Sequence, residues 1–316
     1  MNKMRTVGLV YSPIYLEHDM GSGHPESPER LRALMKHLEE TGLKEKLVEI
    51  EPAPAPLEWI EKVHSSDHVR FVRDVCENGG GLLDYGDTLA NARSYDAGLL
   101  AAGAGLAAVD AVMDGRVERA FCAVRPPGHH AERDRAMGFC LFNNVAIAAA
   151  YLRDKHGVGR VLIVDWDVHH GNGTEHTFYD SPDVSYFSVH QYPHYPGTGA
   201  AGDDGTGDGK GFTVNIPLAA GAGDKEYVEA FNDRFLPAAR EFRPECVLIS
   251  AGFDAHRSDP LSAMQVSEDG YRRMTRMLCD LADETATGRV VSFLEGGYDL
   301  TAMPRAAGVH MEEMLI

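Results

Sequence analysis

Polar side chains that could bind a metal ion follow two short apolar runs of the sequence. Asp165, Asp167 and His169 alternate after one run, and Asp254 follows another. If the chain stays extended beyond the first run, the three alternating side chains point the same way, and Asp254 makes a further carboxylate available. Capping and loop hydrogen bonds would also explain such a cluster. Two carboxylates and one imidazole, however, leave an open position for water, as in a catalytic zinc site.

Two other segments carry groups suited to proton transfer and to carbonyl polarisation. His129 and His130 end an Arg-Pro-Pro-Gly-His-His turn, and Tyr298 follows the paired glycines Gly296 and Gly297. A histidine pair on a loop could simply be exposed to solvent, and a tyrosine after two glycines is more often a packing residue. Four runs with polar groups at their ends favour a shared site, because ligands bind beyond the carboxyl ends of parallel strands.

The elements that must position these groups alternate between strands and helices. Several short runs are apolar on both faces, which is typical of strands buried in a parallel sheet. The predicted strands cover 7–11, 120–124, 161–164, 184–189, 247–250 and 290–294, and the predicted helices lie near 28–40, 91–113, 142–156, 224–241 and 268–286. This alternation predicts an α/β fold with a central parallel sheet flanked by helices on both faces.

Composition favours a single soluble domain over residues 1–316. The formal net charge of −18 disfavours direct binding of nucleic acid or anionic membranes and favours cationic ligands. The five cysteines are scattered and form no C-x-x-C pair, so they predict neither a disulfide framework nor a cysteine zinc site. The apolar stretch near the N-terminus is too short for a signal peptide or a membrane span, and we expect a cytoplasmic protein.

Taken together, these motifs resemble the histone deacetylase family, most closely its class II branch. The matching segments are Arg125 to His130, Met137 to Cys140, Val164 to Thr174 and Glu295 to Tyr298. The resemblance begins near His24 and runs to the end of the chain. It implies a single-domain arginase/deacetylase fold in which an acetyl-lysine tunnel leads to zinc at the carboxyl edge of the sheet.

The resemblance also implies roles for the metal ligands and the oxyanion donor. By position, Asp167, His169 and Asp254 are the zinc ligands, although iron could replace zinc in such a site. Tyr298 donates a hydrogen bond to the tetrahedral oxyanion. Because the tyrosine is present, the resemblance implies an active enzyme.

The histidine pair acquires acid and base roles from the same resemblance. His130 is the general base and then the acid that protonates the leaving amine, while His129 gives electrostatic support beside it. Asp165 orients His129, and Asn172 orients His130 at a position where class I enzymes carry Asp. The protonation behaviour of His130 should therefore follow class II.

The tunnel and two potassium sites are implied less directly. Phe139 and Tyr195 match the aromatic pair that walls the tunnel, and Gly138 lets the substrate stem pass close to the backbone. Asp87 is a further candidate for holding a substrate backbone at the rim. The implied potassium ligands are Asp165, Asp167, His169, Ser188 and Val189 in one site and Phe178, Ser181 and Val184 in the other.

The residue after Ser258-Asp259-Pro260 bears on the choice of amine. Polyamine deacetylases of the family carry a Glu gatekeeper there, whereas this chain has Leu261. We therefore expect acetyl-lysine in a peptide or protein as the substrate. The acidic charge keeps acetylpolyamines and other small acylated amines as the alternative.

More distant alternatives remain open at this point. A ureohydrolase shares the fold and binds two manganese ions, and Asp254-Ala255-His256 superficially resembles one of its motifs, but in the reverse order along the chain. A protein that binds acetylated ligands without turnover would keep the same motifs. His37, His156 and His310 fall in helical stretches without partners, so we expect them at the surface. A homo-oligomer is compatible with the sequence.

Overall fold

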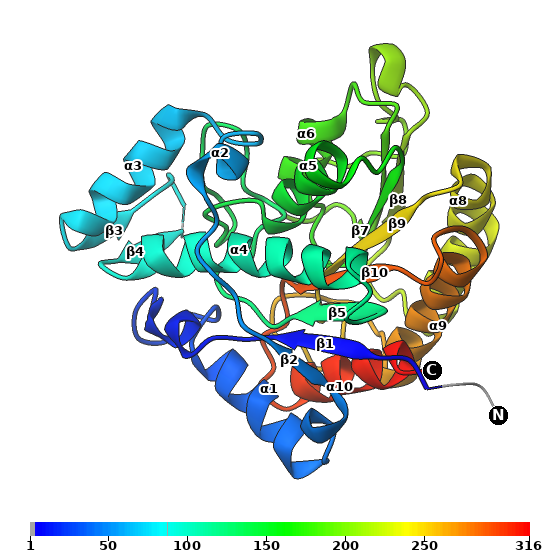
Figure 1. Cartoon of the computed structure of the whole chain (residues 1–316), viewed down its shortest axis with the longest axis horizontal. Helices are drawn as coiled ribbons and strands as arrows, with labels where there is room; N and C mark the ends of the chain where they lie inside the picture. Colours follow the sequence, from blue (N-terminus) through cyan, green and yellow to red (C-terminus); the bar gives the residue numbers. More distant parts are fainter. Residues whose placement is uncertain (1–3, 87) are drawn as a thin grey trace.

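An eight-stranded sheet runs through the centre of the computed structural model, which describes residues 4–86 and 88–316 (Figure 1). The strand order is β2-β1-β5-β10-β9-β6-β7-β8, and every neighbouring pair is parallel. The strands are β1 (Val7–Val10), β2 (Val48–Ile50), β5 (Arg119–Cys122), β6 (Val161–Asp165), β7 (Val184–Gln191), β8 (Thr213–Leu218), β9 (Cys246–Ala251) and β10 (Val290–Leu294). A separate antiparallel pair joins β3 (Gly80–Leu82) to β4 (Leu89–Asn91).

Helices cover both faces of the sheet. One face is covered by α4 (Ser94–Met113) and α5 (Asn144–His156), with α2 (Leu57–Ile60), α3 (Ser66–Glu77) and α6 (Asn172–Phe178) on the same side (Figure 1). The other face is covered by α1 (Glu29–Glu40), α9 (Glu268–Thr285) and α10 (Ala302–Met314), with α7 (Asp224–Ala230) and α8 (Leu236–Phe242) packed beside α9. The predicted single-domain α/β fold with a flanked parallel sheet is confirmed.

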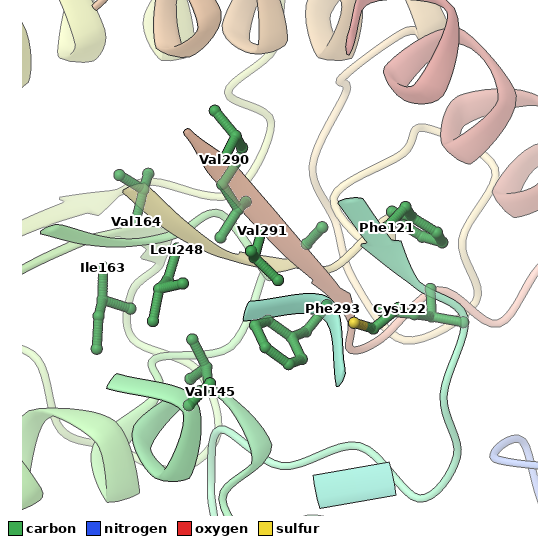
Figure 2. Packing of buried hydrophobic residues seen from close by; sticks show 14 of the residues in the cluster. Phe121, Cys122, Val145, Ile163, Val164, Leu248, Val290, Val291 and Phe293 are labelled. Carbon is green, nitrogen blue, oxygen red and sulfur yellow. The ribbon is translucent and has the colours of Figure 1, made fainter. Parts of the chain in front are cut away.

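The core forms where aliphatic side chains of adjacent strands meet a helix. Ile163, Leu248 and Val291 are register partners across β6, β9 and β10, and all three are fully buried. Figure 2 shows Ile163 and Leu248 on the same face of the sheet as Val145 of α5, with Val164 on the opposite face. Burying one such side chain contributes about 1.5–3 kcal/mol, so the middle of the sheet is a rigid support for the loops that follow it.

Most predicted elements are present, and the differences have local causes. The predicted helix over 224–241 is interrupted by a π-helical turn at Phe231–Phe235. The strands β2 and β8 and the helices α2, α3 and α6 were not among the predicted elements, and α10 was anticipated only as a helical stretch around His310. Of these, β2, α2 and α6 are too short to give a periodic signal. The helix α4 is long and apolar enough for a membrane span, but 72% of that stretch is buried inside the protein, as in a core helix.

The prediction for His310 is wrong. His37 and His156 are partly exposed, but His310 is fully buried, between Thr275 of α9 and Ser292 of β10. Its ring also lies 5.3 Å from the indole of Trp166, edge to face. The apolar face of α10 packs on the sheet, and this carries His310 inward.

Candidate active site

The candidate site lies at the carboxyl ends of β5, β10, β9 and β6, the four central strands of the sheet. The loops after β5 and β6 carry the histidine pair and Asp167 with His169, while those after β9 and β10 carry Asp254 and Tyr298. Because parallel strands end at one edge, segments up to 167 residues apart in sequence converge there, as the hydrogen bond from Gly128 N–H to Glu295 shows.

Asp167, His169 and Asp254 form a buried cluster in which one potential ligand atom of each lies within 4.8 Å of the others. The Nδ1 atom of His169 lies 3.0 Å from Oδ1 of Asp167 and 3.1 Å from Oδ2 of Asp254. The chain does not stay extended here: it bends after Trp166, so Asp165 turns to His129 instead of joining the cluster. The expectation that Asp165, Asp167 and His169 point the same way is therefore wrong.

The backbone holds the two carboxylates in fixed orientations. Gly296 N–H donates to Oδ2 of Asp167 at 2.8 Å, and Val168 N–H donates to Oδ1 of Asp254 at 2.8 Å. A Cβ atom on Gly296 would lie 2.1 Å from Oδ2 of Asp254, so only glycine allows this approach. Hydrogen bonds of this kind preorganise ligands around a metal ion.

Charges in the cluster fit a divalent cation. Burial and the charge of Asp167 raise the pKa of Asp254 to about 7. Burial opposes protonation of His169, but its hydrogen bonds to the two carboxylates raise its pKa to about 10. A positive charge among these three groups is therefore favoured, and the donor set of two carboxylates and one imidazole suits zinc or iron.

The histidine pair is held by two different partners. Nδ1 of His129 lies 3.0 Å from Oδ2 of Asp165, and Nδ1 of His130 lies 2.8 Å from Oδ1 of Asn172. Burial opposes protonation of His129, but the charges of Asp165 and Asp167 raise its pKa to about 10. Burial and the neighbouring His129 hold the pKa of His130 well below its usual range. Opposite pKa shifts in two adjacent groups are typical of active sites in which the two groups have different acid and base roles.

A pocket of about 660 Å³ opens above the cluster, and His130, His169 and Tyr298 line it. Burial holds the pKa of Tyr298 well above its usual range, although the Arg30 guanidinium opposes this shift. That guanidinium lies 5.0 Å from the centre of the Tyr298 ring. The phenol therefore stays protonated near neutral pH and can donate a hydrogen bond.

The predicted tunnel residues Gly138, Phe139, Tyr195 and Leu261 all line this pocket. Phe139 packs edge to face on Tyr298, at 6.0 Å between ring centres, and Tyr195 packs in the same way on His130 at 5.1 Å. Gly138 has a φ of +57°, and a Cβ atom there would lie 2.3 Å from the His130 ring. The narrow approach to His130 therefore requires glycine at this position.

The remaining predicted residues lie outside the pocket. Asp165 and Ser188 are register partners on β6 and β7, with Val189 next to Ser188, while Phe178, Ser181 and Val184 follow one another from α6 into β7. Their potassium-binding role stays a prediction. Asp87 lies outside the described residues.

Sequence reasoning missed two histidines of the pocket. His24 packs edge to face on Phe139 at 4.7 Å, and His194 stacks on His169. The only sequence signal for His194 is its place directly before Tyr195, within Tyr192-Pro193-His194-Tyr195-Pro196.

Comparison with known proteins agrees with this geometry. The histone deacetylase domain model matches residues 24–314. A probable deacetylase of Archaeoglobus fulgidus is 42% identical over 93% of this chain and 81% of its own length. The histone deacetylase-like amidohydrolase of Pseudomonas aeruginosa is 40% identical over 95% of the chain and 79% of that protein. The class defined by fold and site is thus a deacetylase-type hydrolase.

The chain belongs to the histone deacetylase family. The crystal structure of the HDA15 HD domain superposes with a TM-score of 0.94 at 40% identity, covering 98% of this chain and 88% of that one. The human polyamine deacetylase HDAC10 is 42% identical over 92% of the chain, but the chain spans only 44% of that protein. The ureohydrolase alternative is therefore set aside.

Proposed function

We propose that this chain is a zinc-dependent deacetylase that hydrolyses the acetyl amide of acetyl-lysine side chains in peptides or proteins. The choice of amine rests on which residues line the pocket. Among residues 4–86 and 88–316, no aspartate or glutamate lines it, and Leu261 is one of its lining residues. A lysine stem needs apolar walls, whereas the second ammonium group of a polyamine needs a carboxylate.

Asp167, His169 and Asp254 would hold the zinc ion. When bound, zinc supplies a Lewis acid that polarises the amide carbonyl and makes water a better nucleophile at neutral pH. Supporting this assignment, the three side chains are buried, backbone N–H groups fix both carboxylates, and His169 lines the pocket.

The protein groups would then move the protons. Neutral His130 takes a proton from the attacking water as the carbon–oxygen bond forms. It then gives that proton to the amine nitrogen as the carbon–nitrogen bond breaks, which releases the free amine and acetic acid, and the acid ionises to acetate. Tyr298 donates a hydrogen bond to the oxygen that becomes negatively charged, and the cationic His129 stabilises the same charge.

The walls would position the substrate and keep water out. Phe139 and Tyr195 flank the four-carbon stem, and Gly138 leaves room for it beside His130. Holding the amide next to the base in the right orientation accelerates the reaction, because the reacting groups no longer have to meet by diffusion.

An acetylpolyamine is the second candidate, because of the net charge of −18 and the 42% identity to the human polyamine deacetylase HDAC10. The deciding experiment compares kcat/KM of the zinc-loaded protein for an acetyl-lysine peptide and for an acetylated spermidine, with amine release as the readout. At least about tenfold preference for the peptide is expected. Preference for the polyamine would overturn the choice of amine, and turnover of neither compound would overturn the proposed reaction.

A further inference from the structure

The general base of the proposed reaction depends on an amide for its orientation. Nδ1 of His130 lies 2.8 Å from the side chain of Asn172, and an amide can present either its oxygen or its NH₂ group to a ring nitrogen. If the oxygen faces His130, the proton sits on Nδ1 and Nε2 is free to accept one. If the NH₂ group faces His130, the proton moves to Nε2 and the base is blocked.

A buried carboxylate lies on the far side of this amide. Nδ2 of Asn172 donates to Oε1 of Glu132 at 2.5 Å, and Nδ1 of His176 lies 2.8 Å and 2.9 Å from the two oxygens of the same carboxylate. Glu132 is 7% exposed, whereas half of the His176 side chain is exposed. A chain of hydrogen bonds thus runs from His130 through Asn172 and Glu132 to the protein surface.

The backbone around Glu132 fixes the position of its carboxylate. Glu132 N–H donates to the carbonyl of Arg135 at 3.0 Å, and Nδ1 of His64 lies 2.8 Å from the Glu132 carbonyl oxygen. On the other side of the contact, α6 packs so close to residue 131 that a Cβ atom on Gly173 would lie 2.2 Å from the Ala131 carbonyl oxygen. Neither partner can move away from the other without breaking these contacts.

We propose that Glu132 is a positioning residue for His130 that acts through Asn172. A carboxylate can only accept hydrogen bonds, so it requires the NH₂ group of Asn172 to face it and turns the amide oxygen to His130. The proton of neutral His130 is thereby held on Nδ1, and Nε2 remains the unprotonated nitrogen. The inference rests on the proposed function for its catalytic consequence, but the orientation itself does not depend on turnover.

The surface end of the chain balances the charge of Glu132. The hydrogen bond between His176 and Glu132 raises the pKa of His176. The Arg135 guanidinium lies 3.7 Å from the same Glu132 carboxylate. The carboxylate therefore has the His176 imidazole and the Arg135 guanidinium on the outside and a neutral amide on the inside. This arrangement leaves Asn172 as the link between Glu132 and the site.

The first test separates orientation from stability. Glu132→Leu removes the acceptor and should lower kcat about 10- to 100-fold with little change in KM, while Glu132→Gln keeps an acceptor oxygen and should stay within about fivefold of wild type. Glu313→Leu is the matched control, since Glu313 is equally buried but pairs with Arg272 and Arg276, away from the site. An unchanged kcat in Glu132→Leu, or an equal loss in the control, would overturn the proposal.

The second test asks whether Glu132 acts through Asn172. In an Asn172→Leu background, adding Glu132→Leu should cost less than about twofold further in kcat, because the link is already broken. If the loss of kcat in the double variant equals the product of the losses in the two single variants, Glu132 acts independently of Asn172.

The third test needs no turnover. Nitrogen NMR of the zinc-loaded, ¹⁵N-histidine-labelled protein should show His130 protonated on Nδ1 in wild type and as a mixture of both tautomers in Glu132→Leu. A single Nδ1–H tautomer in the variant would refute the inference. If wild type hydrolyses no acetylated amine, the proposed function fails, but this spectrum still decides the role of Glu132.

Discussion

The imidazole of His194 stacks on the imidazole of His169, with ring centres 5.0 Å apart and planes 18° apart. The Nε2–H group of His194 also donates to the carbonyl of Leu261 at 3.0 Å. Burial and the charge of His169 lower the pKa of His194, so its ring is neutral and carries a single N–H. His194 therefore ties the loop of Tyr195 to the loop of Leu261 in the wall of the pocket.

Replacing His194 should loosen the wall of the pocket more than it changes the chemistry. His194→Ala should raise KM about 3- to 10-fold for an acetyl-lysine peptide with a smaller change in kcat, because the wall that holds the stem loses two contacts. His194→Phe keeps a ring on His169, so its KM should lie between those of wild type and His194→Ala. Steady-state kinetics of the three proteins check this, and an unchanged KM in the alanine variant would remove the positioning role.

Removing the hydroxyl group of Tyr298 should reduce stabilisation of the transition state without affecting metal binding. Tyr298→Phe should lower kcat about 10²-fold or more, because one donor to the developing oxyanion is lost. Zinc content should not change, since Tyr298 lies outside the cluster of carboxylates and imidazole. Kinetics and metal analysis of the same preparation test both statements, and near-normal turnover would exclude the oxyanion role.

Asp254→Ala should lose metal and activity together. The variant removes one of the three proposed ligands and should retain less than about a fifth of the zinc bound by wild type after dialysis against a weak chelator. Tyr298→Phe, treated in parallel, serves as the control. Full zinc occupancy in Asp254→Ala would show that Asp254 is not a ligand.

The sequence predicts those parts of the site whose residues lie next to each other in the chain. Asp167 and His169 follow one buried strand, and the histidine pair follows another, so strand ends and short motifs locate them without a structure. The sheet is predictable for the same reason, because strands such as β6 are buried along their whole length and read as apolar runs.

Contacts between distant loops could not be predicted in this way. His194 bonds to a backbone carbonyl, which carries no sequence signal, and Glu132 reaches Asn172 across 40 positions. His310 looked like a surface residue because a helical pattern does not specify what the helix packs against. Such relationships depend on tertiary packing rather than on local periodicity.

Changing Leu261 in the pocket wall should change the preferred amine. Leu261→Glu places a carboxylate where a second ammonium group of a polyamine would lie, so the ratio of kcat/KM for acetylated spermidine over peptide should rise about tenfold or more. Leu261→Gln controls for size and polarity. If both variants respond equally, charge at position 261 does not select the amine.

The buried His310 should make the protein less stable in mild acid. Burial lowers its pKa to about 3, so the folded state keeps it neutral while the unfolded chain binds a proton below its ordinary pKa of about 6.5. Stability is therefore lost as pH falls through this window, by about 2 kcal/mol between pH 7 and pH 5 for this one group. His64 and His190 add to the loss, since burial lowers the pKa of each to about 3 as well.

His310→Gln isolates the contribution of His310. The variant should be less stable than wild type at pH 7, because Gln fits the contacts to Thr275 and Ser292 less well, but it should lose about 2 kcal/mol less on going to pH 5. Urea unfolding at both pH values measures the two differences. Equal losses in wild type and variant would mean that His310 is protonated in the folded state, contrary to its burial between α9, α10 and β10.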